Sequence, residues 1–350
     1  MFSTHFAFTA LGALAFLSQD LGFKVEADSI VAKRFEEATR WELETAELWV
    51  DGELVEQELP PVAGSTQRVV RITDEYEAVE EGRVTKLLRE FVELDASSAW
   101  TFGEGAESAR YSTRALSELE GALVRFVWNA EAGEYDAIVE EGARDEDVQG
   151  LEYDMDLLAL LPDRAIEVGG TWSLDGADLA RAFRPGGDLG LRIDDATEGS
   201  LFSVPSATVL AAGLVTPSEV LADAEGDVTA KLLGTEDVDG RRLARIRLEG
   251  GLEGRRDLSV LLRTAAEDNL TTPTDVADWS LVSTLECEFT GTLLFDLGAG
   301  RIDSLELTGD IVGEHELEWS ETVFEGQVST FRSVYETQGT LTVRVAVEHE

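Results

Sequence analysis

Residues 281–295 read LVSTLECEFTGTLLF, and this stretch decides the fold class. From Leu281 to Phe295 the odd positions are mostly apolar, whereas threonine and glutamate fill most of the even positions. This alternation with a period of two residues predicts a long β-strand with one apolar face and one solvated face. The residues that follow, DLGAG at 296–300, tolerate a left-handed backbone and predict a tight turn.

The alternation resumes after this turn. Apolar residues recur from Leu305 to Trp319, and the positions between them hold mainly Glu, Asp and Thr. The two segments therefore predict a long antiparallel hairpin whose outer face is acidic.

Several other tight turns predict further hairpins. The dipeptides Asp51-Gly52, Glu81-Gly82 and Asp239-Gly240 separate segments with strand-like patterns. Residues 84–94 would also allow a helix, but the tight turns around them favour a strand. The predicted strands are 39–50 with a bulge, 54–59, 69–79, 84–94, 119–128, 135–139, 227–235, 242–248, 331–335 and 341–347.

The remaining segments predict few helices. Residues 28–37 could form a short helix or lead into the first strand, and residues 103–114 are expected to form a loop. The predicted short helices are 156–161, 179–183, part of 205–225 starting near Pro217, and part of 257–277.

Long strands with short turns predict a mainly β (α+β) protein built from antiparallel hairpins. The apolar faces need a cover, which could be a second sheet, closure into a barrel, or short helices lying in an open half-barrel. Similar turns recur in the same order in residues 28–190 and 191–350, which suggests two related β-rich halves and an ancient duplication.

The composition is strongly acidic. The chain of 350 residues carries 71 acidic and 28 basic residues, a formal net charge of −43. A field of this sign repels phosphate backbones and disfavours an anionic membrane surface, so we expect no nucleic-acid partner. The scarcity of lysine is consistent with a saline habitat or with a GC-rich genome, and neither is a function.

The N-terminus predicts export. Residues 6–17 form an uncharged apolar run, too short to span a bilayer and of the right length for a signal peptide. Val25 and Ala27 suit a cleavage point after residue 27, so residues 1–27 are expected to be removed. A buried N-terminal helix is the alternative. No other stretch is apolar enough for a transmembrane helix, and we expect a periplasmic or extracellular protein.

The residues that usually perform catalysis are scarce. Cys287 is the only cysteine, and its apolar strand position predicts a buried, inert thiol. Of three histidines, only His315 lies in the body of the chain, and it falls on the apolar side of its strand. These counts disfavour catalytic triads, Cys-His dyads and histidine-rich zinc sites. No phosphate-binding glycine loop is present, so the chain favours a non-enzymatic protein.

One acidic segment partly matches a calcium loop. Asp145, Asp147 and Asp156 occupy its first, third and twelfth positions, and Gly150 supplies the turn at the sixth. The fifth position is Gln, and the twelfth is not the bidentate Glu. These three aspartates are the only predicted metal site, and no other cofactor is expected.

Residues 161–172 read LPDRAIEVGGTW. This pattern resembles a segment of secreted bacterial β-rich proteins of unknown function. The resemblance covers about twelve residues, implies export and β structure, and transfers no site. The residues themselves predict a turn that leads into a strand, with Trp172 as an anchor.

Together these patterns predict an exported, non-enzymatic binding or scaffold protein of the bacterial cell envelope. A half-barrel could hold a lipid-like molecule, and envelope proteins are the other expected partners. The predicted ligand-binding face consists of Leu285, Phe289, Phe295, Leu307 and Ile311. The alternative is a carbohydrate hydrolase that uses two carboxylates in a cleft, with an exposed tryptophan to stack on sugars.

Overall fold

The computed structural model describes residues 18–56, 61–103, 109–197, 207, 211, 214–269, 276–322 and 327–348. One antiparallel sheet of fourteen strands organises the molecule, with β1 and β9 forming a separate small pair. Its hydrogen-bonded order is β10-β12-β13-β14-β15-β16-β2-β4-β5-β6-β11, with β3, β7 and β8 attached beside this path. The first and last strands of the path do not pair with each other, so the sheet is open.

The elements have the following bounds. The strands are β1 (Ser18–Gln19), β2 (Ser29–Val50), β3 (Glu53–Val55), β4 (Val62–Glu80), β5 (Arg83–Phe102), β6 (Ala109–Leu116), β7 (Leu123–Asn129), β8 (Glu134–Glu141), β9 (Ile166–Glu167), β10 (Thr171–Asp175), β11 (Arg192–Thr197), β12 (Asp227–Val238), β13 (Arg241–Asp257), β14 (Ser280–Asp296), β15 (Arg301–Thr322) and β16 (Val328–Glu348). The helices are η2 (Leu158–Leu160), α1 (Gly176–Phe183), α3 (Pro217–Val220) and α4 (Ser259–Asn269).

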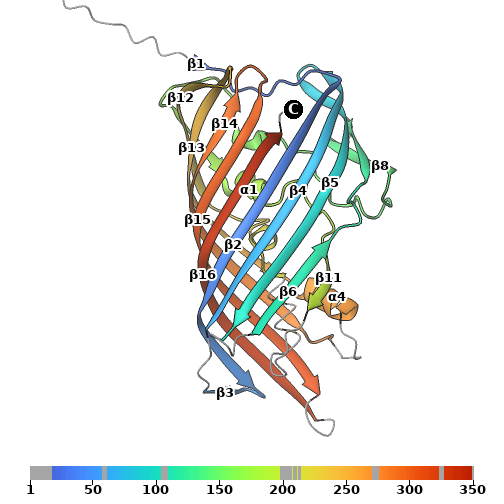
Figure 1. Ribbon diagram of the computed structural model, residues 1–350, viewed down its shortest axis with the longest axis vertical. Coiled ribbons are helices and arrows are strands. Elements are labelled where there is room, and N and C mark those ends of the chain that lie inside the picture. Colours follow the sequence, from blue (N-terminus) through green and yellow to red (C-terminus); the bar gives the residue numbers. More distant parts are fainter. Residues whose placement is uncertain are drawn as a thin grey trace, which may run out of the picture.

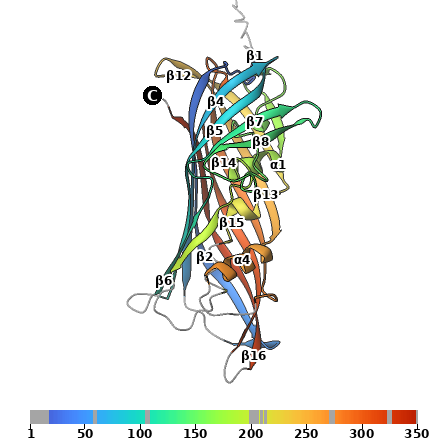
Figure 2. The same cartoon turned by 90° about the vertical axis from the view of Figure 1, so that its right-hand side faces the viewer.

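The sheet is strongly curved along its long, tilted strands (Figure 1). Viewed from the open side, its two wings flank helices α1 and α4, which lie on the concave face (Figure 2). The molecule is therefore an open half-barrel with a helical cover, rather than a sandwich or a closed barrel. Glycines on the inner face help the curvature: a side chain at Gly309 would collide with Phe289 and Cys287.

The central hairpin predicted from the sequence is confirmed. β14 and β15 pair from Ser280↔Glu318 to Asp296↔Arg301, with one register shift near the turn. The carboxylate of Asp296 accepts hydrogen bonds from the backbone N–H groups of Gly298 and Ala299, which stabilises the turn. Leu285 and Leu307 are buried on the inner face, and glutamates and aspartates line the outer one.

The Asx-Gly and Glu-Gly turns form as predicted. Asp51, Glu81 and Asp239 each have a φ of 51°, and the glycine after each also has a positive φ, so both central residues are left-handed. This geometry matches the twist of the flanking strands. The bulge predicted in residues 39–50 lies at Glu44, where the β2–β16 register shifts.

Some sequence-based assignments were wrong in extent. Residues 28–37 are neither a helix nor a lead-in, because β2 begins at Ser29 and its whole length pairs with neighbours. Residues 109–114, expected to lie in a loop, belong to β6, which lies between β5 and β11. Residues 331–335 and 341–347 are parts of one strand, β16. The helix expected at 156–161 is only the 3₁₀ turn η2.

Strands from both sides of residue 190 share the sheet. β16 pairs with β2 from Phe331↔Val50 to Glu348↔Ala32, β11 pairs with β6, and β10 pairs with β12. One cluster of buried side chains also draws on both halves of the chain. The division into 28–190 and 191–350 is therefore not visible as a break in the sheet, and the duplication stays a prediction.

Residues 18–27 pack against the body. β1 pairs with β9, the Lys24 N–H donates to the Gly300 carbonyl at 2.7 Å, and Leu21 is buried in the core. Phe23 lies 6.4 Å from Tyr76 between ring centroids. The first part of the expected signal peptide, residues 1–17, lies outside the described residues. Within the described part of the chain, helices long and apolar enough to cross a membrane are absent.

Candidate functional site

Two polar groups lie on the concave face, and strand β2 contributes to both. Its inward-facing side chains alternate with outward ones in the order Val31, Lys33, Phe35, Glu37 and Thr39, all less than a tenth exposed. Phe35 separates a polar network around Lys33 from a cavity at Glu37. Within the described part of the chain, buried polar atoms without a hydrogen-bond partner occur at the cavity and not in the network.

The network around Lys33 is fully paired. Lys33 Nζ lies 2.8 Å from Asp74 Oδ2 and 2.6 Å from Asp156 Oδ1. Arg89 donates to both oxygens of Asp74, at 2.7 and 3.0 Å, and Tyr76 Oη donates to Asp156 at 2.8 Å. Two cations thus face two carboxylates. Burial alone would raise the pKa of Asp74, but Arg89 and Lys33 outweigh it and hold that pKa below its usual value.

This network anchors the segment that leads into η2. Arg89 also donates to the backbone carbonyls of Glu152 and Tyr153, at 3.3 and 3.0 Å. Asp154 accepts from the N–H groups of Asp156 and Leu158. Because every charge has a partner within the protein, the network is structural: it fixes part of the cover to the sheet.

A cavity of about 330 Å³ lies farther along the concave face, between the sheet and its cover. Its floor comes from β2, β4, β5 and β6, and its walls from α3, β13, the start of α4 and the segment after α1. The volume is at the lower end of the ~300–1,000 Å³ typical of small-molecule sites. Its main apolar lining residues are Leu189, Leu191, Ile193, Leu214, Val260 and Leu261.

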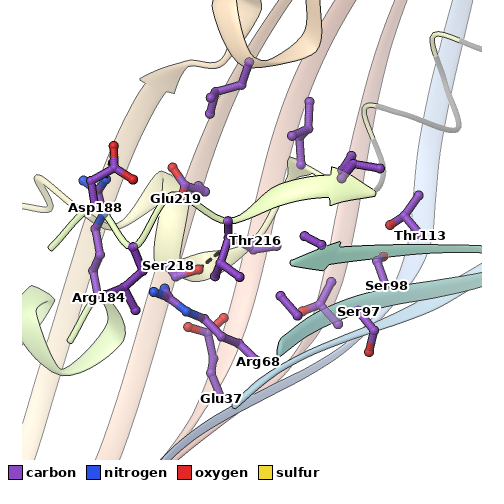
Figure 3. A pocket seen from close by; sticks show the side chains of 18 of the residues that line it. Glu37, Arg68, Ser97, Ser98, Thr113, Arg184, Asp188, Thr216, Ser218 and Glu219 are labelled. Carbon is purple, nitrogen blue, oxygen red and sulfur yellow. Dashed lines mark hydrogen bonds and ion pairs between the residues drawn. The ribbon is translucent and has the colours of Figure 1, made fainter. Parts of the chain in front are cut away.

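Glu37 and Arg68 stand on the floor of this cavity, directly opposite each other on β2 and β4. In Figure 3 they point toward Thr216 and Ser218 in the cover. Glu37 is 6% exposed and Arg68 is 8% exposed. Even so, Glu37 Oε2 and Arg68 Nε have no hydrogen-bond partner among the described residues. Buried polar atoms are nearly always satisfied, so this pair points to a missing ligand or water.

Burial changes the ionisation of both groups. It raises the pKa of Glu37 to about 7, although Arg68 and the backbone N–H of Ser218 favour the charged form. The nearby carboxylate of Glu219 raises that pKa further. Burial also lowers the pKa of Arg68, and Glu37 only partly offsets this. Glu37 can therefore exchange a proton near neutral pH.

A row of hydroxyl groups crosses the floor beside this pair. Thr39, Thr66, Ser98 and Thr113 face one another in register on β2, β4, β5 and β6, and each is at most 5% exposed. The hydroxyls of Thr39 and Thr66 have no hydrogen-bond partner in the described part of the chain. The floor thus offers several donors and acceptors next to the apolar side chains of the cavity.

The charges at the rim are paired, unlike those on the floor. Arg256 Nη1 lies 3.1 Å from Glu219 Oε2, and Arg184 Nη2 lies 3.8 Å from Asp188 Oδ2. Asp257 caps the start of α4 by accepting from the Ser259 N–H at 2.8 Å. Two other residues on α4, Val260 and Leu261, leave apolar surface exposed at the rim, at 67% and 39%.

The predicted apolar ligand face lies elsewhere. All five residues belong to the packed core at 0–4% exposure, and none of them lines this cavity. They are Leu285, Phe289, Phe295, Leu307 and Ile311.

The aspartates of the predicted calcium loop are not brought together as ligands. Asp147 pairs with Arg144 at 2.8 Å, Asp156 pairs with Lys33 and Tyr76, and Asp145 is exposed. Among the described residues, no group of three or more His, Cys, Asp or Glu side chains could hold a metal ion. The physical reason is that Asp156 belongs to the structural network, where two cations already surround the carboxylates.

His315 and Cys287 behave as core residues. The imidazole of His315 lies 3.2 Å from the Ser283 hydroxyl and 3.0 Å from the Thr337 hydroxyl, and burial lowers its pKa to about 4. Burial raises the pKa of the Cys287 thiol to about 12. Trp172 anchors the start of β10, because its indole N–H donates to the Leu160 carbonyl at 3.2 Å.

Sequence reasoning missed Glu37 and Arg68, although the sequence carries a signal for them. Both occupy inward positions of alternating strands, where apolar residues are the rule. A charged residue at such a position is either paired or functional. Only the register between β2 and β4 shows that they face each other across the same cavity.

Comparison with known proteins adds little. No family model matches the chain, and no curated protein matches it. A crystal structure of a DUF1329 family protein from Desulfovibrio piger aligns over 85% of this chain and 83% of that chain, at 9% sequence identity. The TM-score is 0.12, so this likeness carries no argument about fold or function.

Proposed function

We propose that this chain is an exported, non-enzymatic binding protein of the cell envelope that holds a small amphipathic molecule in the cavity above Glu37 and Arg68. One observation carries the proposal. A partly apolar cavity contains a buried carboxyl group and a buried guanidinium, and one atom of each, Glu37 Oε2 and Arg68 Nε, lacks a hydrogen-bond partner in the described chain. Such groups destabilise the empty protein, and a polar ligand group would satisfy them.

The alternative, a carbohydrate hydrolase, has less support in this cavity. None of the residues that line the cavity is aromatic, so the described lining offers no platform for stacking on a sugar ring. The other carboxylates that line this cavity are all engaged: Asp188 by Arg184, Glu219 by Arg256, and Asp257 by the backbone N–H of Ser259. A second free carboxylate, which glycoside hydrolysis requires, is therefore missing from this site.

The proposal of export rests on the apolar run at residues 6–17. Cleavage after Ala27 would remove Leu21 from the core and break the contact of Lys24 with Gly300. These contacts support a cleavage point before Ser18. The intact mass of the protein secreted by a bacterial host would test this, because it gives the first residue directly.

A dye-binding experiment tests the binding function. We expect the small neutral dye 1-aminoanthracene to bind the purified protein saturably. Ala96 lines the cavity, so Ala96→Phe should fill it and weaken dye binding by about tenfold or more. Val92 lies on the same strand and is 36% exposed, which makes Val92→Phe a matched control that should bind like the wild type.

Equal dye affinity in the two variants would overturn the proposed binding function, since the dye would then not occupy this cavity. Saturable binding that only Ala96→Phe weakens would support it.

A further inference from the structure

The Arg68 guanidinium is the group that the fold explains least. Elsewhere on the concave face, Arg89 binds both oxygens of a carboxylate. Arg68 is buried to a similar extent, yet its Nε–H has no acceptor among the described residues. An arginine presents its donors as a planar fork that matches a carboxylate or a phosphate. The cavity therefore has a place for an anionic group.

We infer that the ligand of this cavity is a monocarboxylic acid with a short apolar tail, whose carboxylate binds Arg68 and shares a proton with Glu37. This inference rests on the proposed binding function and assigns the chemical class of its ligand.

The polar atoms on the floor suit such a group. A carboxylate accepts hydrogen bonds only, and the floor supplies donors: Arg68 Nε–H, the Thr66 hydroxyl and the Thr113 hydroxyl. Glu37, when protonated, adds an O–H donor through Oε2. Two carboxyl groups that share one proton are a stable arrangement, because two adjacent negative charges in a buried site are avoided.

Other charged head groups fit less well. A phosphate would place up to two negative charges between Glu37 and Glu219, with Arg68 as the only unpaired guanidinium on the floor of the described cavity. An amine would give Arg68 no acceptor. A singly charged, planar carboxylate satisfies Arg68 without this excess of charge.

The charges around Glu37 do not supply the missing partner. The charged groups on the cover and rim form ion pairs with each other, and Asp257 caps the start of α4. The titratable and charged groups that line the cavity with Glu37 are Arg68 from β4, Glu219 from α3, Arg184 and Asp188 from the segment after α1, and Arg256 and Asp257 from β13.

The tail has an apolar path from the floor to the rim. Leu189, Leu191 and Leu214 line the walls, and the exposed side chains of Val260 and Leu261 continue this surface at the rim. Burial of the tail against these residues would contribute ~25 cal/mol for each Å² of apolar surface. This apolar path favours an alkyl or similar chain over a polar one.

Displacement of 1-aminoanthracene by three ligands with the same chain tests the head group. We expect octanoate to displace the dye at a concentration at least about tenfold below that needed for 1-octanol or octyl phosphate. If 1-octanol displaces the dye as well as octanoate, the binding function stands and the carboxylate assignment falls. Tighter binding of octyl phosphate would also overturn it. If none of the three displaces the dye, the assignment of a monocarboxylic acid falls, while the comparison of Ala96→Phe with Val92→Phe still decides the binding function.

The pH dependence tests the role of Glu37. Above the pKa of Glu37, about 7 in the free protein, octanoate must bind together with a proton. Its affinity should therefore be level between about pH 6 and pH 7 and should fall by up to about tenfold per pH unit above that. In Glu37→Gln, which cannot ionise, the affinity should stay level. Identical pH profiles would overturn the shared proton.

A second variant isolates Arg68. In the Glu37→Gln background, Arg68→Gln leaves no uncompensated charge on the floor. We expect it to weaken octanoate by about 100-fold and 1-octanol by less than about threefold. Retained binding of 1-octanol shows that the variant is folded. Should the variant not fold, the comparison of octanoate with 1-octanol in the wild type still decides the inference.

Discussion

Glu37 is a residue whose position weakens the fold. Burial raises its pKa from 4.5 to about 7, so the folded state holds a proton that the unfolded chain releases between those values. Stability is therefore greatest below about pH 4.5 with respect to this group, and it falls as the pH rises toward 7. The loss is about 3 kcal/mol at most.

Glu37→Gln should remove this dependence. We expect the variant to be more stable than the wild type by ~1–3 kcal/mol at about pH 8, with the difference shrinking toward about pH 5. Urea unfolding of both proteins at the two pH values measures it. A constant difference would mean that Glu37 ionises normally in the folded protein. Under the proposed binding function, this loss of stability is the cost of a preformed site.

Asp74 shows the opposite case, a buried charge that the fold needs. Its side chain is 0% exposed and contacts both Lys33 and Arg89. Asp74→Asn would leave those two cations with Asp156 alone, and we expect a loss of ~3–5 kcal/mol in the free energy of unfolding. The control is Glu306→Gln, which breaks an ion pair with Arg344 whose side chains are about 60% exposed. That change should cost less than ~1 kcal/mol. Similar losses in both variants would contradict the assigned role of the network.

Individual site residues were also the features hardest to predict from the sequence alone. His315 and Cys287 could be placed in the core, because strand alternation shows which face a residue occupies. Alternation does not show which strand lies opposite, so the sequence alone could not predict that Glu37 faces Arg68. It depends on the register of β2 and β4, and on a cover drawn from α3, β13 and α4.

At the scale of elements, the turn signals were the strongest information. The dipeptides at 51–52, 81–82 and 239–240 all form hairpin turns, because glycine readily takes a positive φ there. Strand β6 was missed because its sequence, ARYSTRAL, has little apolar alternation. It is held by backbone pairing to β5 and β11, which leaves no pattern in the side chains.

Glu81 is strained within one of these turns. It has a φ of 51°, a conformation that asparagine tolerates better than glutamate does. Glu81→Asn should therefore stabilise the protein by ~0.5–1 kcal/mol, measured as a shift of the urea midpoint at constant slope. Glu131→Asn is the control, since it makes the same change in a turn where φ is not positive. An equal gain in the control would attribute the effect to charge rather than to backbone strain.

The whole molecule is shaped by an apolar concave face and an acidic convex face. The sequence was compatible with three architectures. The apolar face of a sheet can be covered by a second sheet, by closure of the sheet into a barrel, or by helices that lie in an open half-barrel. Only the strand order shows that both ends of the sheet are free and that helices cover the interior. The acidic outer face, by contrast, follows directly from the alternation in residues 281–319.

This acidic face makes the stability of the molecule depend on salt. Like charges stand directly opposite in the outer register, as at Glu288↔Asp310 and Glu314↔Glu336. With a net charge of −43, we expect the melting temperature to rise by ~5 °C or more between low salt and ~1 M NaCl, because the Debye length falls to ~3 Å.

Single substitutions separate local repulsion from net charge. At low salt, Glu288→Gln should stabilise the protein by ~0.2–1 kcal/mol, because Glu288 lies opposite Asp310. Glu306→Gln should not stabilise it, because Glu306 lies opposite Arg344. A melting temperature that is insensitive to salt would show that local ion pairs, rather than net repulsion, govern the outer face.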